Sequence, residues 1–465
     1  MLNLKKKRKL ILEGKMSKVI LLLAGPIMLN NIIQSIYNLT DTYFVSQLGS
    51  TQMAAMTLVF PVIFFFLSIG MGINIAGTSL ISQYIGNEKK DEATKVAGEV
   101  LTVALLISVS LGIPGGILAP QIIKLMGGSG ELLQHATHFL RIMLFGMPTL
   151  FLFLAFTAIK QGQGDTVTPM KYTGLSVSLN ILLDPIFIFV LDLGIAGAAY
   201  ATVLSRGLFA AHAIYTLFFK QSGIKIRPHD LKLDNNVYKL IKVGVPSSIG
   251  QSMAAFGFMF LNGFIIAFGE STLAAFGIGN RINSLILMPA MGIGKTLATI
   301  VGQNLGADQT KRAKKAVKTS ILLSTTFMVT SGLIFFPFIP TVIRLFTDNL
   351  AVISQGIRYM RLITLALPLM GIFQIFVGTF QGSGHTVFAM IMTMGRLWAL
   401  RLPMIVLFKR YTTWGSDSVW YAMVLSNGIS CLVGLGIYLT GKWEEKVIEK
   451  EEEEITGKVA LNESE

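Results

Sequence analysis

The chain has 465 residues, of which 52% are hydrophobic and only 14% are charged, whereas about a quarter of the residues in an average soluble domain are charged. So few charges cannot cover the surface of a soluble protein of this length, which excludes a cytosolic globular enzyme and a disordered chain and predicts a polytopic membrane protein. The formal net charge of +14 is attributed to basic cytoplasmic loops, with no nucleic acid as a partner.

In chain order, the apolar segments predict twelve membrane-spanning helices. The basic run from Lys5 to Lys9 precedes the first segment and is expected to hold the N-terminus in the cytoplasm. No small-residue cleavage site closes that first segment, so it does not read as a signal peptide. The expected spans are centred near Asn30, Phe65, Ile107, Thr149, Leu179, Leu208, Phe258, Leu287, Met328, Met370, Leu400 and Ile429.

The division of the chain follows from these spans. We expect a multi-pass protein of the cell membrane with both termini cytoplasmic, because Lys and Arg then concentrate in the inside segments, and an odd number of spans would break this bias. The expected parts are a basic N-terminus (1–16), an N-terminal six-helix lobe (17–220), a cytoplasmic connector (221–242), a C-terminal six-helix lobe (243–441) and an acidic cytoplasmic tail (442–465) that contains Glu451 to Glu454.

An internal repeat relates the two lobes. When the chain is shifted so that Pro26 meets Pro246, the halves align without a gap, and the same offset matches Met71-Gly72-Ile73 with Met291-Gly292-Ile293 and Gln161-Gly162 with Gln381-Gly382. Each repeat has an even number of spans, so both enter the membrane from the same side. Parallel repeats of this kind are typical of secondary transporters. The predicted fold is therefore an all-α membrane protein of two six-helix lobes.

A polar face distinguishes the first span from its repeat counterpart. It carries Asn31, Gln34, Tyr37, Asn38 and Asp41, whose spacing places them on one side of a helix. The shifted positions are Gln251, Ala254, Gly257, Phe258 and Leu261, so this polar face belongs to the N-terminal lobe alone. Asp41 is expected toward the outer end of the hydrocarbon core, and an aspartate just beyond the membrane edge is the alternative.

The fifth span carries a second acid. Asn180 and Asp184 are four residues apart on one helix face, and Pro185 removes the backbone donor that would otherwise bond to the carbonyl of Ile181. A carboxylate, an amide and a freed carbonyl suit a hard cation or a proton. The alternative is a loop end near Asp192. The repeat counterpart of Asp184 is Met404.

Two acids within the membrane are costly to ionise, and a proton, Na⁺ or a cationic substrate would each relieve that cost. Competition for the same acids is the physical basis of antiport. Pro26, midway along the first span, permits a helix bend that we hypothesise to be coupled to Asp41, and a static kink is the alternative.

At these residues the sequence resembles the MATE (multidrug and toxic compound extrusion) family, in its DinF-like branch. The matching segments are Gly25-Pro26, Gln34 to Thr42, Asn180 with Asp184-Pro185, and the paired Gln-Gly-x-Gly turns. The resemblance implies two six-helix lobes that export cationic or amphiphilic drugs in exchange for H⁺ or Na⁺. By position, it implies a cation site, with Na⁺ as one candidate ion, at Asp41, Asn180, Asp184 and Thr202, with Tyr37 beside them. The NorM-like branch also uses carboxylates in its seventh and tenth spans, where this chain has Gln251 and Gln374.

The expected function is therefore a secondary active multidrug efflux antiporter, acting as a monomer on organic cations in the lipid bilayer, with no cofactor beyond the coupling ion. One alternative is a flippase for a lipid-linked oligosaccharide, which would use basic residues around a central cavity; the candidates are Arg206, Lys295, Arg396 and Arg401. A membrane-embedded enzyme lacks a nucleophile with its base, because His212 stands alone. A channel is a weaker alternative, because a duplicated two-lobed bundle is better suited to alternating access.

Overall fold

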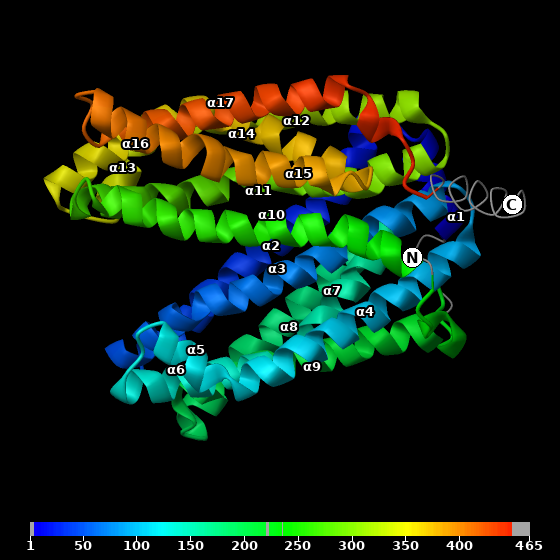
Figure 1. The fold of residues 1–465 in the computed structure, drawn as a ribbon, viewed down its shortest axis with the longest axis horizontal. Helices are drawn as coiled ribbons and strands as arrows, with labels where there is room; N and C mark the ends of the chain where they lie inside the picture. Colours follow the sequence, from blue (N-terminus) through cyan, green and yellow to red (C-terminus); the bar gives the residue numbers. More distant parts are fainter. Residues whose placement is uncertain (1–3, 220–222, 235, 449–465) are drawn as a thin grey trace, which may run out of the picture.

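The computed structural model describes residues 4–219, 223–234 and 236–448, and over these ranges the chain is helical with no β-strand. Glu451 to Glu454 of the expected acidic tail lie outside the described residues. The helices form two elongated lobes, one drawn from blue to green and the other from green to red (Figure 1). The all-α, two-lobed membrane fold predicted from the sequence is confirmed.

The N lobe follows a short N-terminal helix, α1 (Leu4–Glu13). Its elements are α2 (Met16–Ser46), α3 (Ser50–Gly86), α4 (Lys90–Ile117), α5 (Ala119–Leu125), α6 (Gly130–Phe145), α7 (Met147–Gly162), α8 (Val167–Pro185), the π-helix η1 (Ile186–Val190) and α9 (Gly194–Phe219). The connector contains one 3₁₀ turn, η2 (Pro228–Leu231).

The C lobe repeats this order. Its elements are α10 (Asn236–Ile266), α11 (Glu270–Gly306), α12 (Thr310–Phe335), the 3₁₀ turn η3 (Phe336–Phe338), α13 (Ile339–Arg344), α14 (Leu350–Gly382), α15 (Thr386–Met394), the π-helix η4 (Gly395–Arg401), α16 (Leu402–Tyr411), α17 (Asp417–Leu439) and the 3₁₀ turn η5 (Lys442–Glu444). The bounds of α2 and α10, and those of α3 and α11, differ by the same offset that relates Pro26 to Pro246, so the repeat seen in the sequence is also a repeat of helix boundaries.

The fourth span is bent, which the sequence did not predict. Within the described ranges, eleven helical segments are long and apolar enough to cross a membrane. Helices α6 and α7 together make a twelfth candidate, which is bent by 45°. The bend lies at Gly146, where a Cβ atom would come within 2.3 Å of a Val203 side-chain carbon. Pro148 in the first turn of α7 also suits a helix start. The C-lobe counterpart, α14, crosses as one helix with Pro368 inside it.

Each lobe contributes the start of its first helix to the core of the other lobe. Ile20 and Leu23 in the first half of α2 are buried with Leu297 of the C lobe, whereas Val45 near its end belongs to the N-lobe core. The same exchange occurs in α10, which begins in the N-lobe core and ends in the C-lobe core. The first helix of each lobe therefore spans the junction between the lobes.

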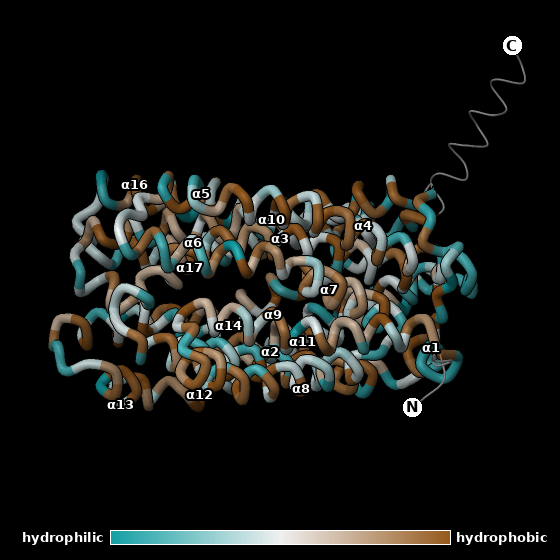
Figure 2. Tube along the Cα trace, turned by 90° about the horizontal axis from the view of Figure 1, so that it is seen from below, coloured by the Kyte–Doolittle hydropathy of each residue, from teal (hydrophilic) through white to brown (hydrophobic). Residues whose placement is uncertain are grey.

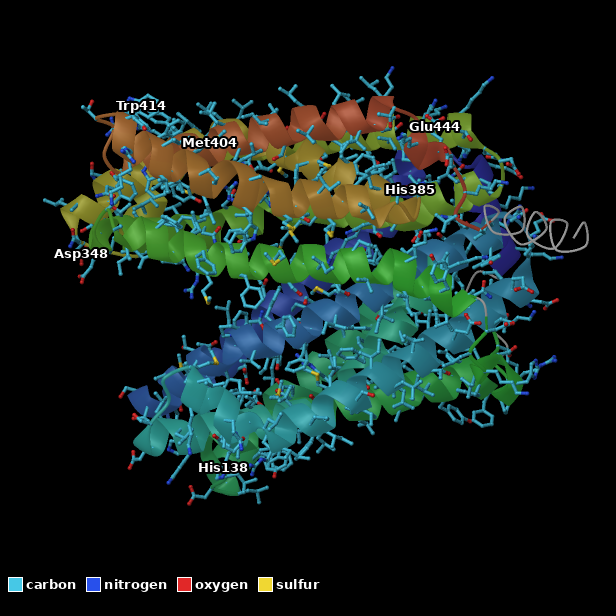
Figure 3. All side chains as sticks on the ribbon, viewed as in Figure 1. His138, Asp348, His385, Met404, Trp414 and Glu444 are labelled. Carbon is cyan, nitrogen blue, oxygen red and sulfur yellow. The ribbon has the colours of Figure 1, made fainter. Side chains whose placement is uncertain are left out.

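The lobes meet tightly at the end of the bundle that carries α1, which we call the closed end. Here the last turns of α3 and α11 lie against each other, with Gly86 facing the Gln303 backbone and Gly306 facing the Gln83 backbone. Gln303 Nε2 also donates to the carbonyl of Gly162, 2.9 Å away. At the opposite, diverging end the lobes run apart (Figure 1), and His138 of the N lobe and Asp348 of the C lobe lie there (Figure 3).

Helix α1 crosses the closed end and contacts both lobes. In the N lobe, Lys7 pairs with Asp165 at 2.8 Å and Arg8 donates to the carbonyl of Gly86 at 2.9 Å. From the C lobe, Arg312 donates to two carbonyl groups at the end of α1. Figure 2 shows hydrophobic stretches along the helices and hydrophilic turns at both ends of the bundle, the pattern expected of helices surrounded by lipid.

Candidate functional site

The polar face of α2 contributes two buried side chains to the interior of the N lobe. Tyr37 and Asp41, four residues apart, are 8% and 6% exposed. The Tyr37 hydroxyl shares a hydrogen bond of 2.9 Å with Thr202 Oγ1 of α9. This bond links α2 to α9 one helical turn before Asp41 in the chain.

The second acid comes from the end of α8. Asp184 is fully buried, and Asn180 Nδ2 donates to its Oδ1 at 3.0 Å. The helix changes register directly after this pair: Pro185 ends α8, and the π-helix η1 follows, in which the Leu191 N–H bonds to the carbonyl of Ile186 at 2.8 Å. Short π-helical segments are often found at functional sites.

The buried oxygens of this cluster have few donors. Asp41 Oδ1, Asn180 Oδ1 and Asp184 Oδ2 are buried and accept no hydrogen bond from any described residue. The two carboxylates also interact electrostatically with each other. Buried acceptors without donors are costly, so a proton or a cation at this point would remove the deficit. Carboxylate, amide and hydroxyl oxygens are suitable ligands for a hard cation such as Na⁺.

Arg206 is the residue of this site that the sequence reasoning did not assign to it. Its guanidinium lies over the Tyr37 ring, 5.0 Å from the centroid, and its charge acts on Asp41. Two acids and one arginine leave the cluster with one formal negative charge when both acids are ionised. The sequence does contain an indication of this position, because Arg206 lies four residues after Thr202 and therefore on the same face of the sixth span.

The remaining predicted residues lie outside this cluster. Asn38 is exposed, and Gln34 and Asn31 are half-buried on α2, with Asn31 ten residues or about 15 Å along the helix from Asp41. Asn31 Nδ2 is buried and has no hydrogen-bond partner among the residues described. Pro26 lies within α2, which continues through it as one helix.

The C lobe has no matching acidic cluster. The positions equivalent to Asp41 and Asp184 hold Leu261 and Met404, and Met404 lies in the C lobe toward its diverging end (Figure 3). The position equivalent to Thr202 holds Ala422, which is buried. Within the described ranges, no group of three or more His, Cys, Asp or Glu is arranged to hold a metal ion. The N-lobe cluster differs from such a group because it contains only two acids, and its other oxygen atoms belong to neutral amide and hydroxyl groups.

Comparison with known proteins gives the family. The MatE family model matches residues 26–186 and again residues 246–407. The chain belongs to the MATE family. Its two matches begin at Pro26 and Pro246, the pair of prolines that the repeat aligns.

Relatives cover nearly the whole chain. A "Probable multidrug resistance protein YoeA" of Bacillus subtilis is 27% identical, with 91% of this chain and 93% of the relative covered. A "Probable multidrug resistance protein NorM" of Thermotoga maritima is 28% identical, with 93% and 94% covered. A solved "outward-facing conformation of a multidrug resistance MATE family transporter" superposes with a TM-score of 0.86 at 29% identity, with 91% of this chain and 95% of that chain covered.

Membership of this family supports multidrug efflux, small-molecule substrates and a multi-pass membrane setting. MATE proteins are transporters and not enzymes.

Proposed function

We propose that this protein is a secondary active antiporter that exports cationic or amphiphilic organic compounds in exchange for H⁺ or Na⁺. The observation that carries the proposal is the set of three buried, unpartnered acceptor oxygens on Asp41, Asn180 and Asp184. A proton or Na⁺ fits this set. The names of the multidrug resistance relatives support organic drugs as substrates.

The geometry divides the tasks among these residues. Asn180 holds one oxygen of Asp184 and leaves the other free to receive a proton or a cation. The bond between Tyr37 and Thr202 keeps α2 against α9, so that Asp41 stays close to Asp184. A coupling ion and a cationic substrate that compete for these two carboxylates would occupy the N lobe in turn. The membrane potential supplies about 2.3 kcal/mol per charge for each 100 mV.

We also propose that both termini are cytoplasmic in the cell membrane and that the protein acts as a monomer. The closed end then faces the cytoplasm, because α1 lies there, and the diverging end faces outward. The basic run of α1 favours this orientation through the positive-inside rule. A monomer suffices because one chain supplies both lobes and the whole cluster.

The test is dye efflux from everted vesicles, with Na⁺ and pH gradients imposed separately. Asp41→Asn and Asp184→Asn should each abolish gradient-driven efflux. The matched control is Asp192→Asn, because Asp192 is exposed near α8 and has a positive φ of 52° that asparagine also adopts readily. Absence of efflux under both gradients would rule out the antiporter, and wild-type efflux by Asp41→Asn would rule out the site.

The flippase alternative finds less support in the positions of the basic residues. Arg401 is only 2% exposed within the C lobe, and the half-buried Arg206 lies over Tyr37 in the N lobe. Arg396 is also half-buried, and Lys295 of α11 is exposed. A pyrophosphate between the lobes would need several cations around one cavity, whereas Arg206 and Arg401 lie in different lobes, so drug export accounts better for the arrangement.

A further inference from the structure

The interior of the C lobe contains two arginines on one π-helical segment. Arg396 and Arg401 are five residues apart within η4, and the i→i+5 bonding of a π-helix brings residues at that spacing to nearly the same face. This face packs against α14 and α17. Arg396 lies over the Phe373 ring of α14, with its guanidinium carbon 3.9 Å from the centroid.

Among the residues that the structure describes, Arg401 is bound by neutral groups only. It is 2% exposed, and it donates to Ser426 Oγ and to Asn427 Oδ1, each at 3.1 Å. Its electrostatic partners in the described part of the chain are Arg396, which carries the same charge, and Tyr359. The one acid of α17, Asp417, is ion-paired with Arg358 at 2.8 Å. It lies three residues from Trp420 but ten residues, or about 15 Å along the helix, from Asn427, the partner of Arg401.

Four unpartnered polar atoms of this region can donate hydrogen bonds. Arg396 Nε, Asn427 Nδ2 and Trp420 Nε1 are buried and donate to nothing within the described residues, and the Tyr359 hydroxyl, which can also donate, has no partner there. In the N-lobe cluster the unpartnered atoms on Asp41, Asn180 and Asp184 are instead acceptors. Unpartnered acceptor oxygens are suited to bind a proton or a cation, whereas unpartnered donors beside arginine are suited to bind an anion.

The two clusters occupy related places in the repeat. The repeat alignment relates Ile181, next to Asn180, to Arg401, and relates Arg206 to Ser426, the hydrogen-bond partner of Arg401. The region that is acidic in the N lobe is thus basic in the C lobe. An arginine pair in the lobe interior without an acid is costly, and a bound anion would offset this cost while accepting hydrogen bonds from the free N–H groups.

We propose that the C-lobe cluster of Tyr359, Arg396, Arg401, Trp420 and Asn427 binds a small monovalent anion, a halide or a carboxylate. The anion must be small because aromatic rings enclose the cluster: the Tyr359 and Trp420 centroids are 4.5 Å apart, and Phe373 covers Arg396. The half-buried Arg396 marks the side from which an anion reaches it. This site is separate from the N-lobe cluster and does not depend on the proposed antiport.

The experiment uses the purified full-length protein in detergent, in sodium gluconate of constant ionic strength into which chloride or formate is titrated. The readouts are the melting temperature and the tryptophan fluorescence. A ligand that binds only the folded state raises its stability with concentration. We therefore expect a saturable rise of several degrees in Tm with either ion, accompanied by a fluorescence change from Trp420.

Three variants identify the site. Arg401→Gln should abolish the rise, and Trp420→Phe, which keeps the ring packing but removes one N–H donor, should weaken the apparent affinity several-fold and remove the fluorescence change. The control Arg281→Gln removes an exposed arginine of the same lobe and should retain the full response. If Arg401→Gln does not fold, the Trp420→Phe titration decides.

Three results would overturn the proposal. One is an equal Tm in gluconate, chloride and formate, which would show that water satisfies the buried donors. Another is an unaltered response in both Arg401→Gln and Trp420→Phe, which would show a general salt effect. The third is a response to inorganic pyrophosphate with none to chloride or formate, which would favour a larger anionic substrate.

Discussion

Replacing Gly86 by alanine should push the two lobes apart at the closed end. A Cβ atom on Gly86 would lie 2.2 Å from the carbonyl oxygen of Gln303 and 2.9 Å from its carbonyl carbon and Cα. These are backbone atoms, so no side-chain rotation relieves the contact. The reciprocal contact, Gly306 against the Gln83 carbonyl oxygen at 2.0 Å, leaves the helices no room to slide in compensation. The α3 and α11 backbones must separate.

Overpacking of this kind costs about 1–3 kcal/mol. The whole cost falls on the state in which the closed end is shut, since the two helices no longer touch once it opens. The ratio of opened to closed molecules should therefore rise by about 5- to 150-fold. Alanine also favours helix over glycine by up to about 1 kcal/mol, but this gain is common to both states and cancels from the ratio.

The assay is a distance measurement between the tips of the two lobes at the diverging end. Leu125 and Leu345 are repeat counterparts in α5 and just after α13, and they are 89% and 78% exposed. Spin labels there, on a Cys431→Ser background, should report a shorter distance in Gly86→Ala, because opening one end of a two-lobed bundle closes the other. The matched control is Gly277→Ala in α11, where an added Cβ meets nothing within 4 Å.

The reasoning fails if Gly86→Ala gives the wild-type distance distribution while the protein remains folded. It also fails if Gly277→Ala shifts the distribution as far as Gly86→Ala does, because the effect would then come from helix propensity.

Three further predictions concern contacts that hold the helices in place. Tyr37→Phe removes the 2.9 Å hydrogen bond to Thr202 and should cost about 1 kcal/mol, seen as a lower Tm, and an unchanged Tm would show that this bond contributes nothing. Burial raises the pKa of Asp165, but the hydrogen bond and charge of Lys7, together with the hydrogen bonds from Thr168, lower it by more, so that the pKa lies below its ordinary value. The stabilising contribution is therefore present above the usual aspartate pKa of about 3.9 and is lost as the pH falls below it. The protection of α1 against hydrogen exchange, relative to the intrinsic rate at each pH, should fall in that acid range in the wild type and stay constant in Asp165→Asn. Arg312→Gln removes the donors to the carbonyl of Ile11 in α1 and to that of Gly14 just after it. It should raise hydrogen exchange in α1 at neutral pH by about tenfold, whereas an equal rise throughout α12 would point to a general loss of packing.

Hydropathy and the repeat predict the spans, because every segment that crosses a bilayer must supply about 20 mainly apolar residues in a helix. They do not predict the bend at Gly146, which depends on how closely α9 approaches through Val203. They also do not predict the π-helical register of η4, which decides that Arg396 and Arg401 share a face. Both features arise from contacts between segments far apart in the chain, and a period of 3.6 residues carries no information about them.

The N-lobe acids could be found from the sequence because they interrupt an apolar pattern and lack counterparts in the repeat. The sequence identifies Arg206 as a basic residue of the apolar region but does not give its position beside Tyr37, since it does not show which face of α9 packs against α2. The sequence does not identify the C-lobe donors, because Tyr359 of α14 and Trp420 of α17 are ordinary aromatic residues of apolar spans. Only their unpartnered polar atoms in the structure distinguish them.

The path of α2 supplies a mechanical link between the N-lobe cluster and the closed end. Leu23 is buried with C-lobe residues, whereas Tyr37 and Asp41 are buried within the N lobe. Pro26 lies between these two regions, at a point where the helix has lost one backbone hydrogen bond. When the lobes separate at the closed end, α2 must release its C-lobe contacts, shift relative to α8 and α9, or bend between its two anchors. We infer that α2 would bend, and that it would do so at Pro26, where a backbone hydrogen bond is already absent. A bend there would move the Tyr37 end of α2 relative to Thr202, so we predict that occupancy of the proposed cation site and opening of the closed end are energetically coupled.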